Sequence, residues 1–167
     1  MPKSSMSGVS VPEEIQKTIT DLKQKKFQYA VFQFKDLGVV DDKKVVGWTQ
    51  VAVGERFEGC RGTKAHLTIE EDILRTEYTK FVAEYMDPES ALFVLYDFSV
   101  VKIDNVKTKI IGIQWCPDNL GVKSKMGYAS SVEELKKECL GPTVVYVQNE
   151  LSEIDYDSII KEFASKN

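Results

Sequence analysis

Few side chains in this sequence have the type and spacing that catalysis requires. Gly54 and Gly59 have the spacing of a phosphate-binding loop, but Cys60 and Arg61 stand where such a loop needs Lys followed by Ser or Thr. The single histidine, His66, has no second ligand at metal-binding spacing. We therefore expect neither a nucleotide site nor a metal centre in this segment.

The remaining reactive side chains also lack catalytic partners. Cys116 follows Trp115 at the end of an expected strand, and no neighbour in sequence would stabilise its thiolate. The acidic runs 13–14 and 70–72 fall in the first turns of expected helices, where carboxylates interact favourably with the helix dipole. The three cysteines have no CxxC spacing, which argues against a disulfide framework or a structural zinc site. We expect no enzyme and no cofactor.

Composition excludes several further classes of protein. The 167 residues are 43% apolar, which suits one domain with an ordinary core. A net charge of −4 argues against a surface built to bind nucleic acid. The longest apolar run, 91–96, is far shorter than the roughly 18 residues of a membrane span, and the N-terminus lacks the apolar segment of a secretory signal. We expect a cytoplasmic monomer that is not an integral membrane protein.

Periodicity and turn signals predict an α+β fold in which a mixed sheet is flanked by helices. Ser10 with Glu13 and Thr68 with Glu71 have capping-box spacing at two helix starts. The segments 36–38 and 41–42 are expected to connect the first two strands. The expected helices are 10–25, 68–87, 122–140 and 156–164, and the expected strands are 29–34, 44–53, 91–101, 107–116 and 143–148.

The helix expected at 122–140 has an unusual outer side. At 100° per residue, one stripe contains Tyr128, Val132, Leu135 and Cys139, and this stripe is the expected core face. The opposite side combines one large apolar side chain with charged and small ones, namely Lys123, Met126, Ser130, Glu133 and Lys137. An exposed methionine between lysines is typical of a contact patch with a cationic rim, although single exposed apolar residues are also common.

The residues around this helix resemble the signature of the actin-depolymerising factor/cofilin family. The matching segments are 115–118 (WCPD) and 122–131 (VKSKMGYASS). Weaker matches lie at 6–9, 96–98 and 153–156. The resemblance implies a single actin-depolymerising-factor homology domain at 7–167, with gelsolin-like architecture and a central sheet of five strands, after a mobile extension at 1–6.

The resemblance also implies a function. Family members bind ADP-actin monomers and filaments and promote filament disassembly and severing, without making or breaking a bond. By position, the monomer-binding surface would consist of Ser7, Gly8, Val9, Lys123, Lys125, Met126, Glu133, Lys136 and Lys137. Met126 would enter an apolar cleft while the lysines meet carboxylates of actin, an acidic protein. Ser7 matches a serine whose phosphorylation turns binding off in the family.

Filament contacts in the family use a basic pair and charges in the last helix. Lys107 and Lys109 match the basic pair. Lys161, Glu162 and Ser165 occupy places where severing members carry an acid and arginines, so we expect monomer binding to be retained while side binding and severing are weaker than in those members. The segment 48–64 matches the family poorly and is either a solvated loop or an added contact.

Other interpretations keep the same fold or the same lysines but assign a different partner. Coactosin-like proteins bind filaments only, and glia maturation factors bind the branching complex. A membrane-surface module that responds to phosphoinositides would use the same lysines, and in the family this interaction is inhibitory. Only Lys43 and Lys44 lie where some relatives have a longer basic run, so nuclear entry is not indicated.

Overall fold

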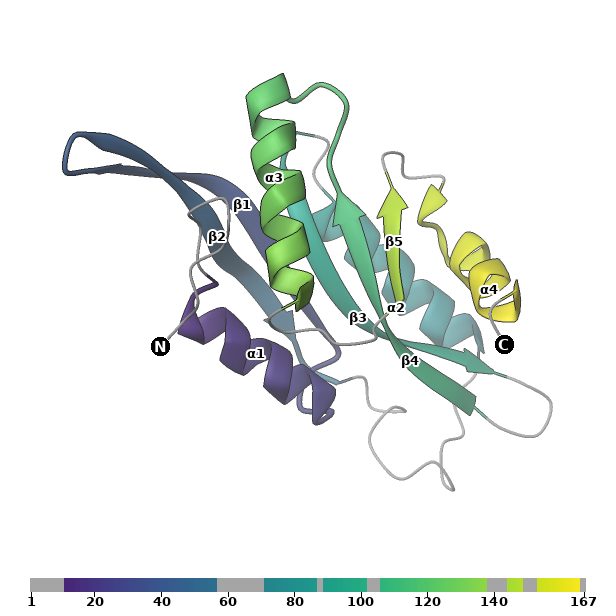
Figure 1. Cartoon of the computed structure of the whole chain (residues 1–167). Helices are drawn as coiled ribbons and strands as arrows, with labels where there is room; N and C mark the ends of the chain where they lie inside the picture. The colour runs from purple at the N-terminus through teal and green to yellow at the C-terminus, as the bar shows by residue number, and fades with distance from the viewer. Residues whose placement is uncertain are drawn as a thin grey trace.

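A computed structural model describes residues 11–56, 71–86, 89–101, 106–137, 144–148 and 153–165. Its strands form one sheet in the order β2-β1-β3-β4-β5, as Figure 1 shows. The strands are β1 (Tyr29–Val40), β2 (Lys43–Gly54), β3 (Ala91–Val101), β4 (Val106–Trp115) and β5 (Val144–Gln148). The first four pair antiparallel, and β5 pairs parallel with β4, so the described sheet is mixed and the α+β class is confirmed.

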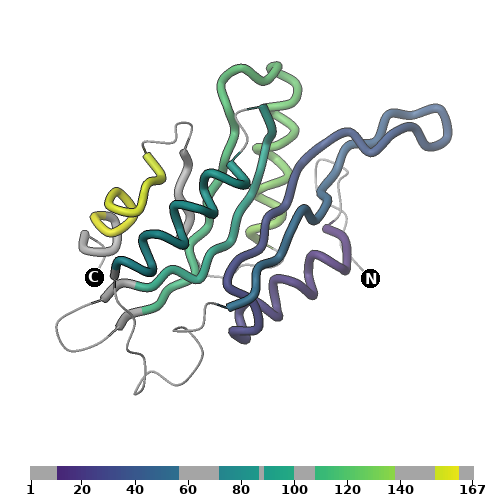
Figure 2. Tube along the Cα trace, turned by 180° about the vertical axis from the view of Figure 1, so that it is seen from behind, coloured from purple at the N-terminus to yellow at the C-terminus, as the bar shows by residue number. Residues whose placement is uncertain are grey.

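Four helices cover the two faces of this sheet. Figures 1 and 2 show one pair on each face: α1 (Glu13–Lys23) with α3 (Val122–Leu135), and α2 (Glu71–Tyr85) with α4 (Tyr156–Ser165). Residues of one strand alternate between these layers, as the two-residue period of a strand requires. In β3, Leu92, Val94 and Tyr96 pack in the α2/α4 layer, whereas Phe93 and Leu95 pack in the α1/α3 layer.

The structure corrects one expected helix end, and two others lie outside the described residues. Helix α1 begins at Glu13 after Pro12, which is the N-cap residue and makes no side-chain cap, so Ser10 is not the cap and the first capping box is wrong. Thr68 lies outside the described residues, and so do residues 138–140 at the expected end of the third helix. The described part of that helix ends at Leu135 and continues in a wider turn at 136–137.

The expected connection between the first two strands is confirmed at 41–42 and wrong at 36–38. Strand β1 continues to Val40, and the turn consists of Asp41 and Asp42, both with positive φ as a tight hairpin turn requires. Gly38 takes a φ of +106°, where a shift of register between Asp36 and Gly38 carries the strand onward. Strand β2 confirms the strand expected at 44–53, so the first part of the segment 48–64, which was expected to be either a solvated loop or an added contact, belongs to the sheet as far as Gly54, and Trp48 is buried.

Candidate functional site

The orientation of α3 is set by an aromatic anchor at Tyr128. Its ring packs against Trp48 at a centroid distance of 5.8 Å and against Phe34 at 6.4 Å. Its hydroxyl donates a hydrogen bond to the carbonyl of Leu92. Burial raises the pKa of Tyr128 well above its ordinary value, so the phenol stays protonated and keeps this bond. The anchor directs the opposite side of the helix outward.

That opposite side, here called the outer face of α3, is solvent-exposed as the sequence predicts. It consists of Lys123, Met126, Ser130, Glu133 and Lys137, all of them exposed. Met126 has 66% of its surface exposed and is accompanied by Val122 at 73%. The expected core stripe is confirmed for Tyr128, Val132 and Leu135, which are buried, while Cys139 lies outside the described residues. The helix therefore presents a thioether to solvent while its other side anchors the fold.

The lysines of this helix differ in whether their ammonium groups pair with other described residues. Lys136 donates to Glu133 at 3.0 Å and to Gln114 at 3.2 Å, and Lys125 forms an ion pair with Asp118 at 3.8 Å. Across the described part of the chain, neither Lys123 nor Lys137 has a carboxylate partner. These two lysines can pair with a partner protein without breaking an internal contact.

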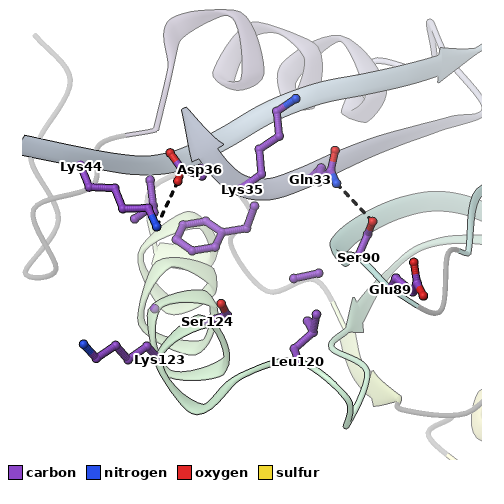
Figure 3. A pocket seen from close by; sticks show the side chains of 13 residues that line it. Gln33, Lys35, Asp36, Lys44, Glu89, Ser90, Leu120, Lys123 and Ser124 are labelled. Carbon is purple, nitrogen blue, oxygen red and sulfur yellow. Dashed lines mark hydrogen bonds and ion pairs between the residues drawn. The ribbon is translucent and has the colours of Figure 1, made fainter. Parts of the chain in front are cut away.

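A groove lies between the N-terminal half of α3 and the β1–β2 hairpin. Its volume is about 470 Å³, and Figure 3 shows side chains of both walls around it. Lys123, Ser124 and Gly127 belong to the helix wall, and the hairpin wall includes Asp36 and Lys44. Sequence reasoning missed this groove because the hairpin was expected to be shorter; the valine pairs 39–40 and 45–46 on either side of the Asp41-Asp42 turn were the available signal.

The residues expected to contact filaments lie away from the outer face of α3. Lys109 is exposed on β4, and its cross-strand partner Phe98 packs in the α2/α4 layer. Lys107 lies two residues earlier on β4, and Lys161 is exposed on α4. The side chains of Lys107 and Glu162 lie outside the described residues. The sheet thus separates these positions from Met126.

Other predicted features give no reactive centre in the described residues. Burial raises the pKa of the Cys116 thiol, which disfavours the thiolate that a nucleophile needs. No group of three or more potential metal ligands occurs in the part of the chain that the structure describes. His66, Cys60 and the segment Ser7, Gly8 and Val9 lie outside it.

Comparison with known proteins decides the family. The sequence model of the Cofilin/tropomyosin-type actin-binding proteins matches residues 8–164, which is nearly the whole chain. The chain belongs to the actin-depolymerising factor/cofilin family. Members of this cofilin family are actin-binding proteins and not enzymes. Among the described helices of this cofilin-family chain, none has the length and apolar character to cross a bilayer.

Individual relatives agree over the full length of the domain. The cofilin of Gibberella zeae is 28% identical over 158 residues, which cover 94% of each chain. The solved structure of the ADF/cofilin from Trypanosoma brucei has a TM-score of 0.63 at 26% identity and covers 98% of this cofilin-family chain and 99% of its own. The cofilin of Streptomyces griseoflavus has a TM-score of 0.68 at 19% identity, covering 96% and 100% respectively, and shows the same fold.

Proposed function

We propose that this chain binds ADP-actin monomers and filaments and promotes filament disassembly in the cytoplasmic actin cytoskeleton. Membership of the cofilin family supports actin as the partner. The observation that carries the proposal is the exposure of Met126 in the middle of the outer face of α3. A large flexible apolar side chain held in water gains free energy when a partner covers it.

The binding mechanism follows from the chemistry of this face. Met126 enters an apolar cleft of actin and supplies most of the affinity, because buried apolar anchors dominate interface energetics. Lys123 and Lys137, which pair with no carboxylate in the part of the chain that the structure describes, meet acidic groups of actin and set orientation and association rate. Lys125 and Lys136 already have internal partners, so they contribute less.

The segment Ser7, Gly8 and Val9 would complete the monomer-binding surface. Phosphorylation of Ser7 would add a charge of about −1.5 to −2 beside a cationic face that meets an acidic protein. The resulting repulsion would switch binding off.

Filament binding would add Lys107, Lys109, Lys161 and Glu162 on the other side of the sheet. Because the charges of the last helix differ from those of severing relatives, we propose that severing is weak while monomer binding is retained. Rapid severing at low occupancy in filament imaging would contradict this assignment.

Replacing Met126 by Ala tests the main proposal. We expect the affinity for ADP-actin monomers to fall about 30-fold, because truncating a central apolar anchor costs about 2 kcal/mol. Native gel shift and titration of labelled actin measure the change. The matched control is Ile73→Ala, which truncates another exposed apolar side chain on a helix of the opposite layer and should leave binding unchanged.

The same titration separates the proposal from its alternatives. A coactosin-like protein would cosediment with filaments but leave the monomer unshifted, and a binder of the branching complex would shift neither. Phosphoinositide binding would be regulatory: vesicles containing these lipids should compete with actin for the lysines, and flotation of the chain in the presence of excess actin should decrease.

A further inference from the structure

The β1–β2 hairpin extends beyond the helices as an arm, defined here as residues 36–46. Figures 1 and 2 both show it leaving the sheet beside the N-terminal half of α3, with neither α1 nor α3 lying over its end. The last buried rings of the hairpin are Phe34 and Trp48, which pack against Tyr128 of α3. Beyond these rings the arm is a two-stranded ribbon.

The arm carries apolar side chains that the fold leaves in water. The exposed fractions are 49% for Leu37, 69% for Val39, 58% for Val40 and 39% for Val46. A two-stranded ribbon in water is only marginally stable. Apolar side chains exposed on such a ribbon are unusual, because they gain no free energy from burial within the fold. Their concentration on a projecting element indicates a surface that a partner covers.

Local polar contacts hold the arm in one conformation. The Asp36 carboxylate accepts a hydrogen bond from the Gly38 amide at 2.8 Å and pairs with the Lys44 ammonium at 3.2 Å. These contacts lower the pKa of Asp36, the Gly38 amide first and Lys44 second, and so keep the carboxylate ionised. The arm is therefore organised before any partner binds, which reduces the entropic cost of binding.

The groove connects the arm to the outer face of α3. Val39 is the cross-strand partner of Lys44, and cross-strand partners lie on the same face of a ribbon. Lys44 lines the groove together with Lys123, which also belongs to the outer face of α3. Figure 3 shows Lys44 and Lys123 at the same end of the groove. One surface thus runs from Met126 through Lys123 to Lys44 and Val39.

We propose that the arm and the groove form a second contact with the actin subunit that binds Met126. Val39 and its apolar neighbours cover apolar surface of that subunit, while Lys123, which has no carboxylate partner among the described residues, pairs with its carboxylates. This inference rests on the proposed function. Continuity favours actin over a second copy of the chain, because the groove shares Lys123 with the outer face of α3, so a subunit that covers Met126 also reaches the arm.

Replacing Val39 by Asp tests the contact. The new carboxylate faces Lys44 across the ribbon, so the arm keeps its fold, but it weakens the cationic groove and repels an acidic partner. We expect the affinity for ADP-actin monomers to fall at least about tenfold, mainly through a slower association rate. A milder variant, Val39→Thr, keeps a β-branched side chain and should lose about twofold.

The matched control is Val51→Asp, which places the same charge at a valine that is 47% exposed on β2 but outside the groove, and it should bind as the wild type does.

Met126→Ala is measured in parallel. If Met126→Ala weakens binding and Val39→Asp does not, the arm inference is wrong and the proposed function stands. If the wild type does not bind actin, both the arm inference and the proposed function are wrong. Sedimentation velocity can detect the alternative, in which the arm contacts a second copy of the chain. A dimer of the wild type that is lost in Val39→Asp, with no change in actin affinity, would also overturn the inference.

Discussion

At the scale of single residues, Asp97 is a carboxylate held by two cations. Its side chain is fully buried, with both carboxylate oxygens 3.0 Å from the Lys25 ammonium and one oxygen 2.7 Å from the Arg56 guanidinium. Lys25 follows α1 and takes a positive φ of 66° to reach it, and Arg56 follows β2. One carboxylate therefore joins the end of the first helix, the edge strand and the centre of the sheet.

Replacing Asp97 by Asn should destabilise the fold strongly. The variant removes the carboxylate charge that faces the Arg56 guanidinium, whose side chain is only 13% exposed, and breaking a buried pair in this way costs about 3 kcal/mol or more. Urea unfolding measures the loss. The control is Asp157→Asn, which breaks the exposed pair with Arg75 and should cost less than about 1 kcal/mol. Equal stability of the two variants would contradict the assignment.

At the scale of elements, the arm shows how a short polar motif extends a strand. Asp36 and Gly38 are residues that usually end strands, yet here the carboxylate of Asp36 bonds the Gly38 amide and lets the pairing resume at Val45. The hairpin then closes at Asp41 and Asp42. The order of the arm therefore depends on the ionisation of one exposed carboxyl group.

The Gly38 amide should report this ionisation directly. Because the contacts lower the pKa of Asp36, its stabilising effect is complete above the ordinary carboxyl value of 3.8 and is lost as the pH falls through the lowered pKa. In an NMR titration, the amide shift of Gly38 should move with a midpoint below 3.8. The variant Asp36→Asn should abolish the transition. A midpoint at or above the ordinary value would contradict the role given to these contacts.

At the scale of the whole molecule, the sheet separates two surfaces. The outer face of α3 belongs to the α1/α3 layer, and Lys109 and Lys161 belong to the side of α2 and α4. Figures 1 and 2 place the start of β4 and α4 at the end of the sheet away from the arm. Substitutions on one surface should therefore leave the other intact.

Reversing the charge of Lys109 should separate filament binding from monomer binding. We expect Lys109→Glu to lower the affinity for filaments about tenfold in cosedimentation, because repulsion replaces attraction at an acidic polymer, and to change monomer affinity less than twofold. The control is Lys80→Glu, the same reversal at an exposed lysine of α2. Equal losses with monomers and filaments would show that the two surfaces are not independent.

The sequence could predict features that depend on periodicity and could not predict features that depend on distant contacts. The 3.6-residue period of α3 places Tyr128 inside and Met126 outside, and the structure confirms both. The pairing of Lys136 with Gln114 depends on how α3 lies on β4, which no local pattern encodes. The arm was missed because Asp36 and Gly38 are turn residues by type, and no local pattern shows that the Asp36 carboxylate contacts both the Gly38 amide and Lys44 across the hairpin.

The two tryptophans of the chain are divided between the layers of the core. Trp48 is buried among α1, α3 and the edge of the sheet, and Trp115 is buried in the other layer with residues of α2 and α4. Each side of the sheet consequently has its own native fluorophore. A variant that keeps only one of the two tryptophans would reveal whether the layer between α3 and the sheet unfolds together with the opposite layer or before it.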